Sequence, residues 1–525
     1  MRKKFFSRLK LPPFPLFLEK SLSFWGSIVL VPIILWGIFL RLNALPIASL
    51  WMDEGYSFLA AQTFQNTGGI TLETGFEYGK NSILFHALQA ESMNLFGTSE
   101  WALRLPSFVF GVLLLFFSFW GTRKALPKSL LPFFFSAAIS LSSWEIVWSV
   151  QGRMYQMLQT LFLVSLYFLW KFFIAPPKKN VSTEIFFFLF FALCTSFVHP
   201  FGSILFPLFF LVWGIRKIRM GFFSSSHKLR NIALFLFPIL LFASWKFDFL
   251  LFLFGNGISS SFLYQSRFLV EQHGIVLMSG YVSALILFWK GDKKQRQNFA
   301  FLLTTFFIPF LIIGLFVPAV NYRYLFPLFP ILLLMGFLWI PIAEKKWGYI
   351  ISTGIALLQC GMLASEWRVL PYAPYALEAD QEHDGYRFYT PQPDFRSAFL
   401  FLKNTKKTGE ILVTPYPEIA RFYGVNADAT FLFDWNERAN EWKDIQRARY
   451  LNLPHIASEE ELETLLRTKS GFVLLDSFAL ERMPLEAAGF LEANAKRISP
   501  FPGEQGVTGD SRLLLFRFGS QESPQ

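Results

Sequence analysis

The stretch LSFWGSIVLVPIILWGIFLRLNALPIASLWMDEGYSF, residues 22–58, places an apolar run shortly before two adjacent acids. The run from Leu22 to Leu42 has about the 20 residues that an α-helix needs to span the hydrocarbon core of a membrane. Asp53 and Glu54 follow in an aromatic setting. The stretch therefore predicts a membrane-anchored chain that holds a carboxylate pair close to the bilayer.

The composition of the 525-residue chain supports this interpretation. Hydrophobic residues make up 53% and charged residues only 16%, whereas about a quarter of the residues of a soluble domain are charged. Its two cysteines, Cys194 and Cys360, are far apart in apolar stretches, which argues against a disulfide framework. The chain has no nucleotide-binding glycine-rich loop, paired CxxC or HExxH motif. We expect an integral membrane protein without a nucleic-acid partner.

Charges and turn residues divide the first 365 residues into apolar segments, which we interpret as eleven transmembrane helices. The expected spans are Leu22 to Leu42, Arg104 to Thr122, Leu130 to Val150, Met154 to Ile174, Glu184 to His199, Phe201 to Ile215, Asn231 to Phe249, His273 to Trp289, Phe299 to Val317, Leu325 to Ile342 and Trp347 to Ser365.

Basic residues gather in alternate connections, namely 2–10, 123–128, 178–179, 216–230, 290–296 and 345–346. The intervening connections hold few cations, chiefly Lys80, Arg153, Arg267 and Arg323. By the positive-inside rule the amino terminus is cytoplasmic. With an odd number of helices, the acids and the carboxyl-terminal tail lie outside the cytoplasm, and we expect a multi-pass protein of the cell (inner) membrane.

The composition changes at residue 366, where charges and prolines appear and spanning runs end. We expect a transmembrane domain over 1–365 and an extracytoplasmic soluble α/β domain over 366–525. Strands are expected at 410–414, 471–476 and 512–518. A helix is expected from Ser458, which with Glu461 fits a capping box.

The first outer loop, residues 43–103, is unusually long. Within it, NSILFHALQAESMNLFG (81–97) has apolar positions near helical spacing and ends at a glycine. It suits a helix that lies along the membrane interface. Thr98 or Ser99 then caps the next membrane helix. The acids are therefore expected between a membrane helix and interfacial helices, where a lipid head group can be bound.

LWMDEGYS (50–57), followed by GKNSILFHALQAESMNLFGTSEWALRLPS (79–107), resembles the GT-C glycosyltransferases, in the branch of protein O-mannosyltransferases and the lipid A aminoarabinose transferase. The residues that match the family pattern are Asp53, Glu54, Lys80, Phe96, Gly97, Ser99, Glu100, Arg104, Leu105 and Pro106. Asn81 and Ser82 replace two prolines of that pattern. QGRMYQML (151–158), VHPFGSILF (198–206) and NYRYLFPLFP (321–330) are similar to further, shorter family segments.

The resemblance implies an inverting transfer of a single sugar from a polyprenyl-phosphate-linked donor to a protein, lipid or glycan acceptor at the outer face of the membrane. A hydroxyl acceptor needs a base, and we assign that role to Asp53, with Glu54 orienting the acceptor or the sugar. The leaving phosphate needs fixed cations. Lys80, Arg153 and Arg323 are the expected phosphate-binding residues.

Each assignment has a structural alternative. Paired acids beside a membrane helix are commonly solvated loop charges, and arginines at helix ends can extend to lipid head groups. The further candidate substrate-binding residues are Tyr56, Glu145, Tyr155, His199 and Tyr324. His199 is also read as a helix-end histidine bound to backbone, and Tyr56 as part of an interfacial aromatic belt. Glu145 is a candidate because a charge inside an apolar segment is costly.

Two other functions remain open at this point. One is a transporter or flippase for a lipid-linked or anionic solute, which requires polar residues deep in several helices. The other is a glycan ligase or polymerase. No cofactor is required by the pattern, although a carboxylate pair is compatible with a divalent cation. The sugar, the acceptor and the metal dependence are not determined by these residues.

Overall fold

The computed structural model describes most of the chain. The described ranges are 16–47, 49–78, 82–127, 129–176, 180–219, 261–316, 322–363, 375–376, 390–391, 393–431, 451–456, 458–476, 479–480, 483–498 and 513–519. The expected span Asn231 to Phe249 and the candidate Lys80 lie outside the described residues.

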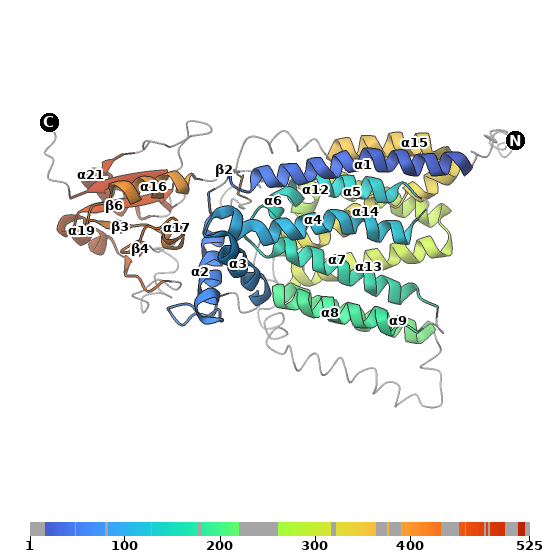
Figure 1. The fold of residues 1–525 in the computed structure, drawn as a ribbon, viewed down its shortest axis with the longest axis horizontal. Coiled ribbons are helices and arrows are strands. Elements are labelled where there is room, and N and C mark those ends of the chain that lie inside the picture. The colour runs from blue at the N-terminus through green and yellow to red at the C-terminus, as the bar shows by residue number, and fades with distance from the viewer. Residues whose placement is uncertain are drawn as a thin grey trace, which may run out of the picture.

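Most of the described residues between 16 and 363 form a bundle of long helices (Figure 1). Its principal helices are α1 (Leu16–Ala44), α4 (Glu100–Ala125), α5 (Leu131–Leu141), α6 (Ser143–Ser149), α7 (Tyr155–Ile174), α8 (Ser182–Val198), α9 (Leu205–Arg219), α12 (Ser261–Lys290), α13 (Lys293–Phe316), α14 (Phe329–Phe337) and α15 (Ile340–Leu363). Short 3-10 turns, η1 (Pro200–Ile204) and η3 (Tyr322–Leu328), precede α9 and α14.

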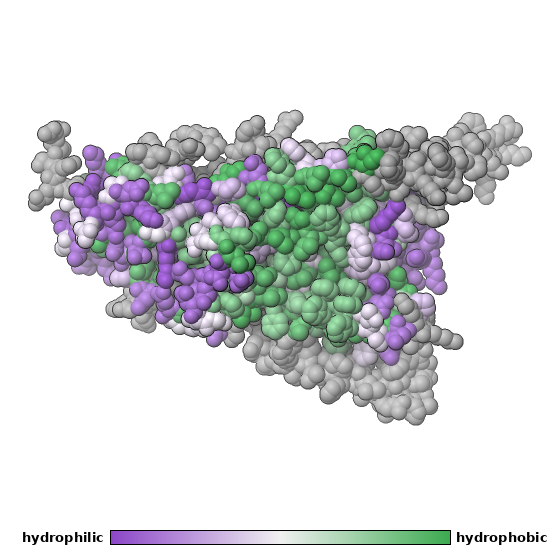
Figure 2. All heavy atoms as spheres, viewed as in Figure 1, coloured by the Kyte–Doolittle hydropathy of each residue, from purple (hydrophilic) through white to green (hydrophobic). Residues whose placement is uncertain are grey.

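Within the described residues, six helices are long and apolar enough to cross a membrane, or seven if α5 and α6 form one span bent by 58°. Two shorter apolar helices cover Ile28–Ala44 and Ser182–Val198. The chain is thus a polytopic helical membrane protein, while the expected count of eleven spans stays a prediction. Figure 2 shows the hydrophobic surface as a band across the bundle, with hydrophilic surface at both ends.

The interior of the bundle explains why so many aromatic residues occur in this sequence. Trp148, Phe162, Phe326 and Phe337 are among the largest fully buried side chains. Phenylalanines such as Phe186 remain exposed on the bundle surface, as expected for a side chain that faces lipid. The aromatic composition therefore serves both packing and lipid contact.

The first outer loop folds into two helices, α2 (Met52–Thr67) and α3 (Ile83–Phe96), which pack against each other. The expected helix at 81–97 is confirmed as α3. Ser99 caps α4 by accepting a hydrogen bond from the Ala102 amide at 3.4 Å. The acids do not lie in an open loop, because Asp53 and Glu54 belong to the first turn of α2. Acidic side chains are favourable there because they face the positive end of the helix dipole.

The carboxyl-terminal residues contain a four-stranded sheet with the strand order β3-β6-β8-β7. Its strands are β3 (Ile411–Val413), β6 (Gly471–Asp476), β7 (Lys496–Arg497) and β8 (Leu513–Phe518). β3 pairs with β6 in parallel, and the other two pairings are antiparallel. The helices beside it are α16 (Phe395–Thr405), α17 (Pro417–Phe422), α19 (Glu459–Thr468) and α21 (Leu485–Asn494). We call residues 393–519 the C-terminal unit.

Three strands and one helix of the C-terminal unit occur where the sequence predicts them. β3, β6 and β8 match the expected strands, and β6 and β8 are almost entirely buried. Ser458 caps α19 by accepting a hydrogen bond from the Glu461 amide at 3.2 Å. Other short strand pairs are β1 (Tyr375–Ala376) with β2 (Thr390–Pro391), and β4 (Thr430–Phe431) with β5 (His455–Ile456).

The C-terminal unit is docked on the first outer loop, with α17 against α2 (Figure 1). The Tyr423 hydroxyl accepts a hydrogen bond from the Leu50 amide at 3.1 Å and donates one to Glu100 at 2.9 Å. Arg396 forms an ion pair with the same Glu100 carboxylate at 2.5 Å. The rings of Phe58 and Phe422 meet edge to face. These contacts hold the C-terminal unit over the acidic pair.

The close approach of α17 to α2 depends on Gly55. A Cβ at this position would collide with Cγ of Glu418 and lie 3.2 Å from Cγ1 of Ile419. We expect Gly55→Ala to weaken the docking by about 1–3 kcal/mol through overpacking, partly offset by about 1 kcal/mol of helix propensity. Faster proteolysis of the C-terminal unit and a lower unfolding temperature in detergent would report this.

Gly489→Ala is the matched control, because Gly489 is helical and a Cβ there meets nothing within 4 Å. That variant should gain about 0.5–1 kcal/mol from helix propensity. Equal proteolytic resistance of the two variants would contradict the role of Gly55.

Candidate active site

Asp53 forms ion pairs with two arginines that come from distant parts of the chain. Its Oδ2 lies 2.6 Å from Nη1 of Arg323 and 3.4 Å from Nη2 of Arg153. Arg153 lies in the turn between α6 and α7, and Arg323 lies in η3. The structure thus brings together three of the residues that the sequence predicts for the site.

The Arg153 guanidinium is held by a second set of contacts. Its Nη1 donates hydrogen bonds to the backbone oxygen of Asp53 at 2.9 Å, to Oγ of Ser57 at 2.9 Å and to the hydroxyl of Tyr78 at 2.8 Å. Sequence reasoning missed Ser57 and Tyr78. Ser57 lies one helical turn after Asp53 on α2, a spacing that could have indicated it.

The charge of Asp53 is set by two opposing effects. Burial disfavours the ionised carboxylate, but Arg153 and Arg323 outweigh burial and lower the pKa of Asp53 below its usual value. Burial raises the pKa of Tyr78, which stays a neutral phenol at pH 7. The centre is therefore an anionic carboxylate that neutralises part of the charge of two arginines.

Aromatic rings from three elements line one side of the ion pairs. Cζ of Arg323 lies 5.8 Å from the ring centre of Tyr155 and 5.9 Å from that of Tyr324. The His199 ring lies 5.7 Å from Tyr155 and 6.0 Å from Tyr324. Nδ1 of His199 accepts a hydrogen bond from the Phe201 amide, so its helix-end role is confirmed. These candidates gather around Arg323.

Glu54 does not take the place that the sequence predicts. Instead of facing a substrate, its side chain is fully buried and forms a two-pronged ion pair with Arg104, with both N–O distances at 2.7 Å. Its Oε1 also accepts a hydrogen bond from the Gly152 amide at 2.5 Å. Both carboxylate oxygens are therefore used by the protein. The pair ties α2 to α4 and fixes the turn that carries Arg153.

Of the two remaining candidates, Tyr56 lies near the Asp53 centre and Glu145 lies inside the bundle. The Tyr56 ring lies 5.7 Å from that of Tyr78, beside the centre. Glu145 is fully buried in the bundle, where its Oε1 accepts a hydrogen bond from Gln159 at 2.9 Å. No contact found in the described residues links Glu145 to Asp53.

A metal ion is poorly suited to this arrangement. Within the described residues, no group of three or more His, Cys, Asp or Glu side chains is placed to hold one. Asp53 already faces two cationic guanidinium groups, which repel a further cation. The divalent cation stays a prediction.

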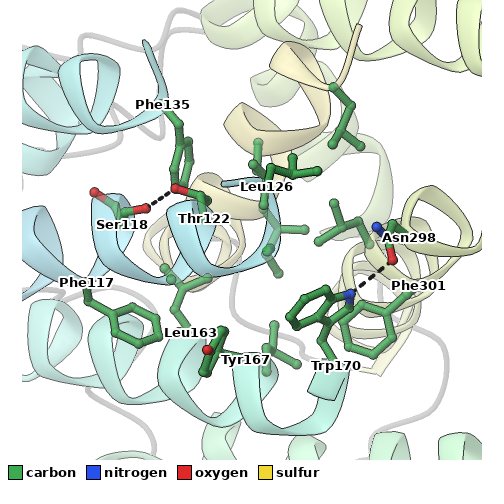
Figure 3. Close-up of a pocket in the computed structure, with 17 residues that line it drawn as sticks. Phe117, Ser118, Thr122, Leu126, Phe135, Leu163, Tyr167, Trp170, Asn298 and Phe301 are labelled. Carbon is green, nitrogen blue, oxygen red and sulfur yellow. Dashed lines mark hydrogen bonds between the residues drawn. The ribbon is translucent and has the colours of Figure 1, made fainter. Parts of the chain in front are cut away.

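A cavity of about 120 Å³ opens elsewhere in the bundle, between α4, α5, α7, α13 and α14 (Figure 3). Its wall is mainly apolar, with Phe117, Leu163 and Phe301 among its residues, and Trp170 donates a hydrogen bond to Asn298 at its edge. Gly121, in its wall, lies about 25 Å along α4 from Arg104 at the helical rise of about 1.5 Å per residue. The cavity is therefore separate from the Asp53 centre.

Comparisons with solved structures identify the fold. ArnT from Cupriavidus metallidurans in the apo state matches with a TM-score of 0.59 and 14% identity, over 96% of this chain and 100% of that chain. The same protein bound to undecaprenyl phosphate matches with a TM-score of 0.57 and 13% identity, over 95% and 99%. The oligosaccharyltransferase AglB from Archaeoglobus fulgidus, in complex with an inhibitory peptide and a dolichol-phosphate, matches with a TM-score of 0.52 and 12% identity, over 96% and 75%.

Both proteins belong to the GT-C superfamily, so this chain has the GT-C fold that its motifs imply. No protein-family model matches the sequence, and no curated protein matches it.

Proposed function

We propose that this chain, which has the GT-C fold, is a membrane glycosyltransferase that moves a single sugar from a polyprenyl-phosphate donor to a hydroxyl acceptor. The observation that carries the proposal is the placement of Asp53, in the first turn of α2, against Arg153 and Arg323 at one end of the bundle. Planar guanidinium groups match the oxygens of a phosphate. A carboxylate and two phosphate-binding groups in contact suit transfer from a lipid phosphate.

The reaction needs one proton acceptor and one stabilised leaving group. The acceptor oxygen attacks the anomeric carbon of the sugar, and the bond from that carbon to the phosphate oxygen breaks. The phosphate leaves with the bonding electron pair and is stabilised by Arg153 and Arg323. Asp53 accepts the hydroxyl proton. Attack opposite the leaving group inverts the anomeric configuration. On the motif resemblance, we also assign Lys80 to the phosphate.

Asp53 and the donor phosphate compete for the same two arginines. In the structure, Oδ2 of Asp53 is the anionic partner of Arg153 and Arg323. A bound phosphate carries its own negative charge and takes over these contacts. Asp53 then loses the two cations that lower its pKa, and it becomes a stronger base. Donor binding thus prepares the base.

Glu54 and Arg104 have a positioning role in this proposal, because their buried ion pair fixes the first turn of α2.

The orientation of the chain in the membrane follows from its charge distribution. With the amino terminus in the cytoplasm, Asp53 and the C-terminal unit both lie at the outer face of the membrane. The acceptor therefore meets the donor outside the cytoplasm, and the C-terminal unit covers the site.

Membrane vesicles that contain the protein test this function. Vesicles supplied with labelled polyprenyl-phosphate monosaccharides should form a labelled glycoside, whereas vesicles without the protein should not. Movement of the label across the membrane without product would instead indicate a transporter or flippase. If a labelled product forms only when the donor is a lipid-linked oligosaccharide, and not from monosaccharide donors, the protein would instead be a ligase or polymerase.

Arg323→Ala should weaken binding of polyprenyl phosphate by about 10- to 100-fold, because one charged hydrogen bond contributes about 1.5–3 kcal/mol. Arg323→Lys should lie in between, since lysine keeps the charge but loses the planar fork. Equilibrium binding of labelled polyprenyl phosphate to the purified protein in nanodiscs gives these affinities.

Lys293→Ala provides the control, because Lys293 is an exposed cation at the start of α13. It should bind the lipid as the unaltered protein does. An Arg323→Ala variant with the affinity of this control would remove Arg323 from the phosphate site.

A further inference from the structure

A second carboxyl group is buried beside Asp53, and it comes from the C-terminal unit. Glu418 is the second residue of α17, the helix that docks on α2. Its Cγ and Cβ occupy the space left by the missing side chain of Gly55, two residues after Asp53. The docking of the C-terminal unit therefore inserts an acidic side chain at the helical turn that carries the proposed base.

The carboxyl group of Glu418 is isolated from solvent. Its residue is only 2% exposed, and among the described residues its Oε1 has no hydrogen-bond partner. A buried polar group without a partner is costly, and most such groups are satisfied. An unsatisfied carboxyl oxygen next to a reaction centre therefore points to a partner that arrives with the substrate.

The charges around Glu418 favour its neutral form. Burial is the main cause that raises the pKa of Glu418 to about 8; a hydrogen bond from its own backbone amide lowers the pKa, and the negative charge of Asp53 raises it further. The other charged groups nearby are already engaged. On α2, Glu54 is paired with Arg104, and on α17 itself Arg421 is paired with Glu73. Tyr423, at the end of α17, is hydrogen-bonded to Glu100. Glu418 is thus protonated at pH 7 while Asp53 is ionised.

We propose that protonated Glu418 donates a hydrogen bond to an oxygen of the hydroxyl acceptor, so that the C-terminal unit supplies one wall of the acceptor site. This inference rests on the proposed function. When one of two neighbouring carboxyls is ionised and the other is protonated, the ionised one can accept a proton and the protonated one can donate a hydrogen bond. Asp53 takes the acceptor proton, while Glu418 keeps its own proton and positions the acceptor. No bond to carbon is made or broken at Glu418.

The protonation of Glu418 determines how the rate of sugar transfer should change with pH. Glu418 is a donor below its pKa of about 8 and becomes an anion above it. An anion there cannot donate a hydrogen bond and repels both Asp53 and the donor phosphate. Transfer should therefore fall as the pH rises through about 8, by about tenfold at about one unit above that value.

Three variants in the vesicle transfer assay test whether Glu418 acts as a neutral hydrogen-bond donor or as a base. Glu418→Gln keeps an N–H donor of similar shape, so its rate at pH 7 should exceed that of Glu418→Ala. The alanine variant should lose about tenfold, the effect of about 1.4 kcal/mol. Glu418→Gln should also lack the alkaline fall, because an amide does not titrate in this range. Glu486→Gln, an exposed glutamate of α21, should keep the unaltered rate and pH profile.

An infrared readout on the purified protein does not depend on turnover. The difference infrared spectrum between the unaltered protein and Glu418→Gln at pH 7 should contain the C=O stretch of one protonated carboxyl. Its titration should shift to lower pH in Asp53→Asn, which removes the charge that raises the pKa of Glu418.

Several outcomes would overturn the inference. A rate in Glu418→Gln as low as in Glu418→Ala would mean that Glu418 acts as a base. An alkaline fall that persists in Glu418→Gln, or a missing infrared band, would mean that Glu418 is not a neutral donor. Absence of transfer by the unaltered protein would instead overturn the proposed function, and the acceptor role with it, while the infrared titration still reports the coupling to Asp53.

Discussion

Asp53→Asn is expected to reduce sugar transfer by about 100- to 10,000-fold, the range found when a general base is removed. The amide has nearly the shape of the carboxylate but cannot take the proton of the acceptor hydroxyl. Asp53 is the carboxylate that contacts both arginines, so no neighbouring group of the ion-pair centre replaces it. The measurement is the initial rate of labelled glycoside formation in vesicles at saturating donor.

The same variant should bind polyprenyl phosphate at least as tightly as the unaltered protein. Without the Asp53 charge, Arg153 and Arg323 lose the anion that competes with the phosphate. Loss of transfer together with equal or tighter lipid binding is a combination that simple misfolding cannot produce. Asp292→Asn, at an exposed aspartate near the opposite end of the bundle, should alter neither quantity. Full transfer activity in Asp53→Asn would remove the proposed base from the mechanism.

Glu54→Ala should destabilise the protein by about 3–5 kcal/mol, because it leaves the Arg104 charge buried without its partner. Arg104 is 2% exposed and Glu54 is fully buried, so water cannot replace the lost carboxylate. The Gly152 amide loses its hydrogen bond as well. Thermal unfolding in detergent measures the loss, and transfer should fall with it because α2 and the Arg153 turn lose their common anchor.

The double variant Glu54→Met with Arg104→Met tests whether the unpaired charge of Arg104 causes the loss of stability in Glu54→Ala. Replacing both members of a buried ion pair by apolar residues of similar size removes the unpaired charge, so it should recover much of the stability. Glu73→Ala breaks the largely exposed pair with Arg421, whose side chains are 59% and 33% exposed. That control should cost at most about 1 kcal/mol. A stability loss in Glu54→Ala no larger than this would contradict the anchoring role.

Much of the fold could be predicted from local patterns. The helix at 83–96, the Ser99 cap and the strands β3, β6 and β8 occur where short-range patterns predict them. The helix α2 was not predicted, because its apolar residues follow no strong helical period. The break between α5 and α6 was missed as well. Both halves are apolar, and Ser142 between them carries no strong breaking signal.

The candidate site was predicted in part. Scarce outer-side charges and short motifs mark Asp53, Arg153 and Arg323, and the structure brings these residues together although Asp53 and Arg323 are 270 positions apart in the chain. The contacts of Glu54 with Arg104 and Gly152 are not evident from the sequence. Adjacent residues of a helix point about 100° apart, so Asp53 and Glu54 face different partners once α2 forms. Glu418 carried no local signal at all.

The sequence alone determined which segments are apolar, which end of the bundle carries the cations and where the acids stand along the chain. These properties depend on residues close together in the chain, and the bilayer and helix geometry act on them directly. Only the tertiary structure decided which charges meet: Asp53 with Arg153 and Arg323, Glu54 with Arg104, and Glu418 beside Gly55. Ion pairing and burial depend on distances across the folded molecule, and the same two acids acquire different roles because one is enclosed by α4 while the other faces the arginines.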